Sequence, residues 1–271
     1  MKKLICAMLA LLTIAAVCSS CALGPNTIDI RYEDVEGGRA VVRYDDKTTI
    51  TELTLDDDVV EIRDFSLCNA ESLTKITIGK GVKTIGTWAM TNNQHLKEFV
   101  VDPANPYFTA VDGVLFSKDM KVLYYYPAGR NIKYDRFGQA LNETTYDIPD
   151  GVEEIRDKAF YKCYYVNVTT FPDSIKRIGE KAFHRCSALK DFKVPASLEF
   201  IGKDAFAYDE NLKKLEIGPK IKEIRDYAFF QCTGMESITI DAKESDLTLG
   251  AKWQPTAKGK IRDDCTITFR Q

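Results

Sequence analysis

The chain has 271 residues, of which 45% are hydrophobic and 28% charged, and its formal net charge is −3. This composition is typical of a folded soluble protein and is ample for a hydrophobic core. Basic and acidic residues are interspersed without a basic stripe, which argues against nucleic acid as a partner.

Residues 1–20 have the features of a secretory signal peptide of the lipoprotein type. Lys2 and Lys3 precede an apolar run over residues 4–17. This run is too short, and wrongly flanked, to be a membrane-spanning helix. The segment therefore predicts export of the protein, and we exclude it from the fold.

The end of this segment suggests a lipid anchor. The sequence C-S-S-C over residues 18–21 resembles a bacterial lipoprotein box, except that Cys18 stands where such boxes usually carry leucine. The resemblance implies a lipid-modified Cys21 and an outer-membrane or cell-surface protein that meets the membrane only through its anchor. Ordinary cleavage after Ala22, giving a secreted or periplasmic protein, is the alternative.

Residues 21–49 are predicted to be a tether followed by a cap. Residues 28–32 and 40–44 are strand-like and flank Gly37-Gly38, a pattern that is typical of a β-hairpin.

Residues 50–245 are dominated by a repeat of 23 residues. An isoleucine anchors each unit: Ile62, Ile85, Ile155, Ile178, Ile201 and Ile224. Apolar residues recur three positions before the anchor and eleven, fourteen and sixteen after it, and an Ala-Phe pair follows at positions four and five. The alternation at fourteen and sixteen has the period of a β-strand, whereas the Ala-Phe stretch suggests a helical or 3-10 turn.

Such a repeat predicts a coil that turns once per unit, with equivalent side chains stacked inside. Burial of one unit's apolar side chains contributes about 10–20 kcal/mol, whereas ordering its residues costs about 35 kcal/mol, so a single coil cannot fold alone. Stacked coils share one core. We therefore expect Phe160, Phe183, Phe206 and Phe229 to form one buried file.

An insertion at about 102–147 interrupts the repeat. The step from Ile85 to Ile155 is 70 residues, which is one unit plus 47. Residues 114–116 and 122–126 predict an inserted β-hairpin. Its Tyr124 and Tyr126 have two interpretations: they cover the coil beneath, or they form an amphipathic patch for a protein or glycan.

The C-terminal segment, residues 246–271, loses the Ala-Phe pair and is predicted to be a cap. Residues 265–269 would form its last strand.

The unit at residues 178–195 reads I-G-E-K-A-F-H-R-C-S-A-L-K-D-F-K-V-P. This motif resembles the BspA-like (treponemal-type) leucine-rich repeat family over residues 50–245. The resemblance implies a right-handed β/α superhelix, with parallel strands on the concave face and turns or short helices on the convex face. It also implies a surface-exposed or secreted bacterial protein, often credited with adhesion, and it brings no catalytic residues.

The residue inventory gives little support for catalysis or metal binding. His95 and His184 occupy unrelated repeat positions, predicted to be exposed, without triad or zinc context. Cys163, Cys186 and Cys232 recur eight positions after the anchor and are expected to be small buried thiols. A disulfide between Cys163 and Cys186 is the alternative. We expect no enzyme activity, cofactor or metal.

The outward positions of the repeated strands are the candidate binding residues. They are Glu52, Lys75, Glu98, Asp191 and Lys214 in one row and Thr54, Thr77, Thr170, Lys193, Glu216 and Thr239 in the other. The alternations Glu52–Lys75–Glu98 and Asp191–Lys214 predict cross-strand charge ladders. Such ladders either keep the sheet soluble and in register, or form a recognition surface.

These patterns together favour a monomeric, adhesin-like module that binds a protein or glycan through the concave sheet and the inserted hairpin. A structural or envelope-assembly lipoprotein without an external ligand is the alternative. A glycan-acting enzyme is a remote one, since it needs two acids facing each other in a cleft.

Overall fold

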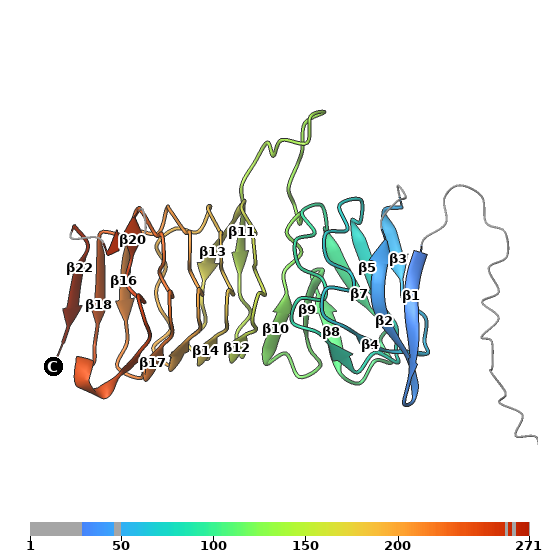
Figure 1. The fold of residues 1–271 in the computed structure, drawn as a ribbon, viewed down its shortest axis with the longest axis horizontal. Coiled ribbons are helices and arrows are strands. Elements are labelled where there is room, and N and C mark those ends of the chain that lie inside the picture. The colour runs from blue at the N-terminus through green and yellow to red at the C-terminus, as the bar shows by residue number, and fades with distance from the viewer. Residues whose placement is uncertain (1–28, 46–49, 258–259, 262–263, 271) are drawn as a thin grey trace, which may run out of the picture.

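The computed structural model describes residues 29–45, 50–257, 260–261 and 264–270. The predicted signal peptide and Cys21 lie outside these residues. The described chain forms one elongated β-solenoid of about nine turns, with the predicted parallel stacking of coils (Figure 1).

One long side of the solenoid, which we call the ladder face, carries the predicted strands. These are β3 (Glu52–Thr54), β5 (Lys75–Ile78), β7 (Glu98–Val101), β11 (Thr144–Asp147), β13 (Val166–Thr170), β16 (Lys214–Ile217), β18 (Ser237–Ile240) and β22 (Thr266–Phe269). They pair in parallel within three separate sheets, β3-β5-β7, β11-β13 and β16-β18-β22. Residues 190–194, between β13 and β16, have the strand-like sequence but no assigned strand.

The opposite side, which we call the short-strand face, is also built from parallel strands. Its parallel strands belong to two separate sheets. One contains β4 (Val59–Ile62) and β6 (Thr84–Ile85), and the other contains β10 (Val122–Tyr125), β12 (Glu154–Ile155), β14 (Arg177–Ile178), β15 (Phe200–Ile201), β17 (Glu223–Ile224) and β19 (Thr248–Leu249). Within each sheet the anchor isoleucines pair with their equivalents in the next coil, as Ile62 does with Ile85 and Ile155 with Ile178.

The expectation of short helices on this side was wrong. Among the described residues the one helix is η1 (Glu244–Asp246), a single 3-10 turn in the C-terminal cap. The reason lies in the corners of the coil, where left-handed residues flank the Ala-Phe pair, as Lys181 (φ 53°) and Arg185 (φ 62°) do. A right-handed helical turn cannot propagate through left-handed residues, so the corner remains a pair of tight turns.

The phenylalanine file is confirmed. Phe160, Phe183, Phe206 and Phe229 are each at most 1% exposed. Their ring centroids are 4.9, 5.4 and 5.5 Å apart in succession, and the rings are nearly parallel. These four coils thus place the same ring on the same axis of the core.

The glycine that follows several anchor isoleucines allows neighbouring coils to approach closely. Asp157 Oδ1 accepts a hydrogen bond of 2.7 Å from the backbone N–H of Glu180 in the next coil. A Cβ on Gly179 would lie only 2.4 Å from the Asp157 backbone nitrogen. Gly179 therefore makes room for an aspartate that ties one coil to the next.

Both ends of the solenoid carry additional strands. At the N-terminal end β1 (Asp29–Val35) and β2 (Gly38–Asp45) form the predicted hairpin, and β2 continues the short-strand face by pairing in parallel with β4. At the C-terminal end β20 (Thr256–Ala257) and β21 (Lys260–Ile261) form a small hairpin. The predicted last strand is present as β22, which pairs with β18.

The insertion is built into the solenoid. Strands β8 (Phe108–Val111) and β9 (Val114–Ser117) pair antiparallel, and β9 pairs with β10 as the predicted hairpin. Strand β10 then pairs in parallel with β12, so it acts as one further coil of the short-strand face. After β10 the chain leaves the body as a loop over residues 130–143, which rises beside β11 (Figure 1).

The core is divided where the insertion meets the regular repeats. Tyr125 belongs to the N-terminal core cluster and Tyr126 to the C-terminal one, and they are 3% and 4% exposed. We call this junction the seam. The Tyr125 hydroxyl donates to the carbonyl oxygens of Gly86 and Thr87, at 2.8 and 2.6 Å. A side chain thus replaces the strand pairing that is missing beyond β6.

Candidate binding surface

The first predicted charge ladder is present on β3, β5 and β7. Lys75 pairs in register with Glu52 and Glu98, and its Nζ lies 3.5 Å from Glu52 Oε2 and 3.8 Å from Glu98 Oε1. All three side chains are partly exposed, so these ion pairs contribute little stability. Their main effect is to place alternating charge along an open surface.

The second predicted ladder, between Asp191 and Lys214, is wrong. Asp191 Oδ1 instead accepts backbone N–H groups of Lys213 and Lys214, at 2.7 and 2.9 Å. The Lys214 ammonium lies 3.7 Å from Glu236. The reason is that Asp191 belongs to the segment without an assigned strand, so its side chain turns to the backbone of the next coil.

The remaining ladder-face residues lie where the repeat places them. Thr54, Thr170 and Glu216 are exposed and Thr77 and Thr239 are half-exposed, each beside a buried neighbour. Lys193 is exposed and lies 3.5 Å from Asp173. These positions form a polar surface along the solenoid.

The tyrosines of the insertion are not part of this surface. Tyr126 is buried in the core, so its assignment as a surface binding residue was wrong. Its ring packs 5.0 Å from Phe160 and so continues the phenylalanine file. Tyr124 is half-buried on the short-strand face, between Phe108 at 5.1 Å and the Arg156 guanidinium at 4.5 Å. Their role in the structure is to fill the seam.

The structure adds a hollow that the sequence did not reveal. It has a volume of about 640 Å³ and lies between the first charge ladder and the base of the projecting loop. We call it the ladder hollow. Its lining includes the predicted Glu52, Lys75 and Glu98 together with Lys97, Asp112 and the loop residues Arg130 and Lys133.

Backbone pairing explains why a hollow forms here. Sheet β3-β5-β7 ends at β7, because the N–H of Phe99 donates to the carbonyl of Gly113 in the insertion, at 2.8 Å. The N–H of Gly129 similarly donates to the carbonyl of Leu96. The chain therefore crosses the end of the sheet without adding a strand, and the face is open until β11.

The charged residues that line the hollow are four cations and three acids, Glu52, Glu98 and Asp112, which gives a net charge of +1. Lys75 is shared by Glu52 and Glu98, whereas Lys97, Arg130 and Lys133 make no ion pair with any described residue. Arg130 Nε donates to the backbone carbonyl of Asp112, at 2.6 Å, which fixes the guanidinium at the edge of the hollow. These cations could contact an anionic ligand without breaking an existing pair.

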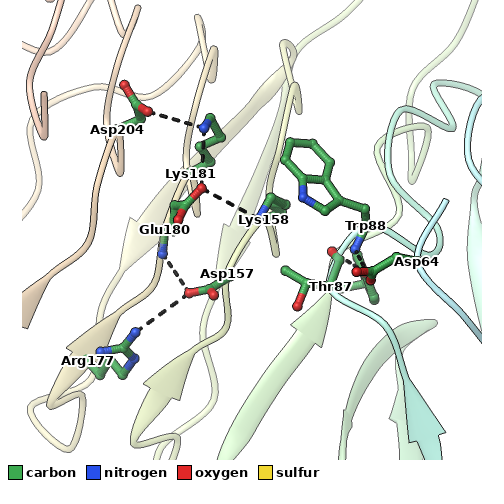
Figure 2. Close-up of polar contacts among 10 residues, drawn as sticks. Asp64, Thr87, Trp88, Asp157, Lys158, Arg177, Glu180, Lys181 and Asp204 are labelled. Atoms are coloured by element: carbon green, nitrogen blue, oxygen red, sulfur yellow. Dashed lines mark hydrogen bonds and ion pairs between the residues drawn. The ribbon is translucent and has the colours of Figure 1, made fainter. Parts of the chain in front are cut away.

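A second group of charged side chains, at the corner between the two faces, is already paired internally (Figure 2). Lys158 is only 4% exposed, and its Nζ lies 4.1 Å from the centre of the Trp88 ring and 3.8 Å from Glu180. Burial lowers the pKa of Lys158, and the nearby Glu180 opposes this shift. Lys181 bridges Glu180 and Asp204, at 3.3 and 3.2 Å.

The corner charges therefore satisfy one another. Trp88 lies against Lys158 on one side and stacks on Phe65 at 5.6 Å, and its edge contacts Tyr161 at 5.4 Å. Because Trp88 belongs to the coil before the insertion and Tyr161 to the coil after it, this cluster joins the two blocks across the seam. Its arrangement is that of a structural joint.

The histidines lie in two different environments. His184 is 9% exposed, so its assignment as an exposed repeat position was wrong. It stacks on Tyr161 at 5.4 Å and contacts Tyr208 at 5.3 Å, and burial lowers its pKa to about 4. His95 is half-exposed beside Tyr134, at 4.7 Å.

The repeated cysteines are buried as predicted. Cys163, Cys186 and Cys232 are at most 1% exposed. Cys163 and Cys186 are not joined to each other, so the alternative of a Cys163–Cys186 disulfide is wrong. The thiols of Cys186 and Cys232 donate to the carbonyls of Phe160 and Phe206, each at 3.0 Å. Burial raises the pKa of Cys186 well above its usual value, so it is a poor nucleophile.

Asp209 occupies the same repeat position as these cysteines. It is fully buried, and its Oδ1 accepts the backbone N–H of Cys186 at 2.7 Å, while Oδ2 has no partner. Burial raises the pKa of this carboxyl well above its ordinary value. The group is sealed from solvent and could not reach a substrate.

Across the described ranges, no three histidine, cysteine or acidic side chains converge as metal ligands. The same ranges contain no helix with the length and apolar character to cross a bilayer.

Comparison with known families supports the repeat architecture. The model of the BspA type leucine rich repeat region matches six copies, over residues 44–121 and 130–250. No curated protein matches the chain.

Several solved bacterial structures share the fold. A leucine-rich repeat protein from Eubacterium ventriosum ATCC 27560 is 19% identical, with a TM-score of 0.60 over 78% of this chain and 62% of that one. A leucine rich cell surface protein from Faecalibacterium prausnitzii A2-165 is 23% identical, with a TM-score of 0.56 over 78% and 61%. The pneumococcal vaccine antigen PcpA is 20% identical, with a TM-score of 0.53 over 83% and 69%. The chain thus spans less than two thirds of the length of the first two structures.

Proposed function

Because the chain belongs to the BspA-type leucine-rich repeat family, we propose that it is a non-enzymatic interaction module of the bacterial cell envelope, which binds its ligand at the ladder hollow and the projecting loop. The ligand would be a protein or a glycan. The shared fold with a leucine rich cell surface protein and with a pneumococcal antigen supports a surface location.

The observation that carries this proposal is the ladder hollow itself. It joins the predicted ladder residues to the projecting loop in one concavity, and three of its cations are without acidic partners. Solenoids commonly use an extended face of this kind for recognition. The loop adds two apolar side chains, Phe137 and Leu141, which are 73% and 66% exposed.

We propose that a lipid on Cys21 attaches the module to the membrane. The box-like sequence over residues 18–21 supports this assignment. Mass spectrometry of the mature N-terminus tests it, because a diacyl or triacyl adduct on Cys21 supports the anchor. A free N-terminus at Leu23 would instead show ordinary cleavage after Ala22.

Binding is tested with the mature protein on arrays of matrix proteins and glycans. We expect a signal that is lost in Thr74→Met, which fills the hollow with a larger uncharged side chain, and retained in Thr239→Met, a matched change at the far end of the ladder face. Protease treatment of intact cells tests exposure. Protection of the protein, together with an empty array, would contradict this function and favour a role inside the envelope.

A further inference from the structure

We propose that the occupant of the ladder hollow is an acidic segment of a polypeptide, held by Lys97, Arg130 and Lys133, with an apolar side chain of the same partner packed against Phe137. This inference rests on the proposed function and specifies its ligand. It differs from the family resemblance, which names no ligand chemistry.

The charge of the hollow favours an acidic ligand. Lys97 and Lys133 are exposed and Arg130 is half-exposed, and none has an acidic partner among the described residues. The carboxylates of Glu52 and Glu98 are already engaged by Lys75. A carboxylate-rich ligand would therefore form new ion pairs while breaking few existing ones. The net positive charge of the hollow also contrasts with the net charge of −3 of the chain.

The lining of the hollow itself favours a polypeptide over a sugar. The hollow is lined by charged and polar side chains and Ile132. Carbohydrate sites commonly offer an aromatic face to the apolar face of a sugar ring. No residue in the described lining of this hollow offers one.

The projecting loop supplies an apolar anchor in a fixed conformation. Asp135 Oδ1 accepts the N–H groups of Phe137 and Gln139, at 2.8 and 2.9 Å. The Tyr134 hydroxyl donates to the carbonyl of Gln94, at 2.8 Å, which ties the loop to the solenoid. The Arg136 guanidinium lies 4.6 Å from the centre of the Phe137 ring. A preorganised exposed aromatic beside arginine is typical of protein–protein interfaces.

The test is fluorescence anisotropy with a labelled peptide that mixes glutamate and leucine, using the whole mature protein. A peptide with lysine in place of glutamate and the anionic glycan polygalacturonate are run beside it. We expect the glutamate peptide to bind preferentially, and its affinity to fall as salt is added. In Lys97→Glu/Lys133→Glu, binding should weaken at least about tenfold, since two favourable charges become repulsive.

A matched control reverses two exposed lysines far from the hollow. Lys220→Glu/Lys243→Glu has the same net charge as the first double variant and should bind as the wild type does. Phe137→Ser should weaken binding of the glutamate-leucine peptide but not of a glutamate-serine peptide. These results together would establish both parts of the inference.

Other outcomes would overturn it. Equal losses in the two double variants would mean that only overall charge matters. Tight binding of polygalacturonate, dependent on Lys97 and Lys133, would make the ligand a glycan. If neutral or basic peptides from a library bind and Thr74→Met abolishes their binding, the proposed function stands and the acidic ligand is wrong. If Thr74→Met changes no array or peptide signal, both fall.

Discussion

Replacing Asp209 by asparagine should stabilise the protein, and the gain should depend on pH. The equivalent residue in the last unit before the insertion is Asn93, whose Oδ1 accepts the N–H of Ala70 at 2.8 Å and whose Nδ2 donates to the carbonyl of Leu67 at 2.9 Å. Asp209 reproduces only the first bond, to Cys186. By the repeat, its Oδ2 faces the carbonyl of Phe183, where an ionised carboxylate has no hydrogen to donate.

The sign follows from the direction of the pKa shift. Burial raises the pKa of Asp209 in the folded state, so the folded protein retains a proton that the unfolded chain releases. Stability is therefore lost as pH rises above the ordinary carboxyl pKa, by about 1.4 kcal/mol per pH unit for as long as the proton is retained. One buried group without a partner costs about 1–3 kcal/mol. We expect Asp209→Asn to gain about 3 kcal/mol at pH 7 and almost nothing at pH 4.

Urea unfolding followed by tryptophan fluorescence, repeated from pH 4 to pH 8, measures this difference directly. The gain at pH 7 corresponds to a rise in Tm of about 6–12 °C. The reciprocal variant Asn93→Asp is the control and should lose stability at pH 7 but not at pH 4. A gain that is constant across pH, or a destabilised Asp209→Asn, would refute the assignment of a protonated carboxyl.

Three further variants probe other contacts. The wild type should lose up to about 3 kcal/mol of stability as pH falls from 6.5 to about 4, because the unfolded histidine takes up a proton before the folded one does. His184→Phe should abolish this loss, and an unchanged acid profile in urea unfolding would contradict the prediction. Gly179→Ala should destabilise by about 1–3 kcal/mol, since its Cβ would collide with the backbone of Asp157, and a neutral Tm would show that the coils can separate. Tyr125→Phe removes a hydroxyl bonded to two carbonyls across the seam; a cost of about 1–3 kcal/mol is expected in thermal unfolding, and an unchanged Tm would mean that water takes its place.

The repeated parts of the fold were predictable because their signal recurs. Period and residue type together placed Phe183 in the core file and Lys75 between two glutamates, and both are found there. The short strands, such as β14 (Arg177–Ile178), were missed since two residues are too few for alternation to show. The 23-residue repeat therefore predicts which side chains point into the core, but not which other backbone segments pair as strands.

The insertion and the hollow could not be read in the same way. Strict alternation would put Tyr125 and Tyr126 on opposite faces, one of them exposed, but β10 ends at Tyr125 and the chain turns, so both rings are buried in different clusters. The hollow depends on Lys97 meeting Arg130 across a break in the sheet. That meeting is set by tertiary structure, and no local signal marks it.

The division of the core at the tyrosine pair has a consequence for how such proteins vary in length. Beyond this junction the strands of each 23-residue unit pair with those of the units on either side, and side chains such as Asp157 bond to the next coil at Glu180. Gene duplication could add a whole unit there, and the array would then gain one core phenylalanine and one strand on each of its two faces. The block that carries the ladder hollow would be unaffected, so the length of the array and the lining of the hollow could evolve independently.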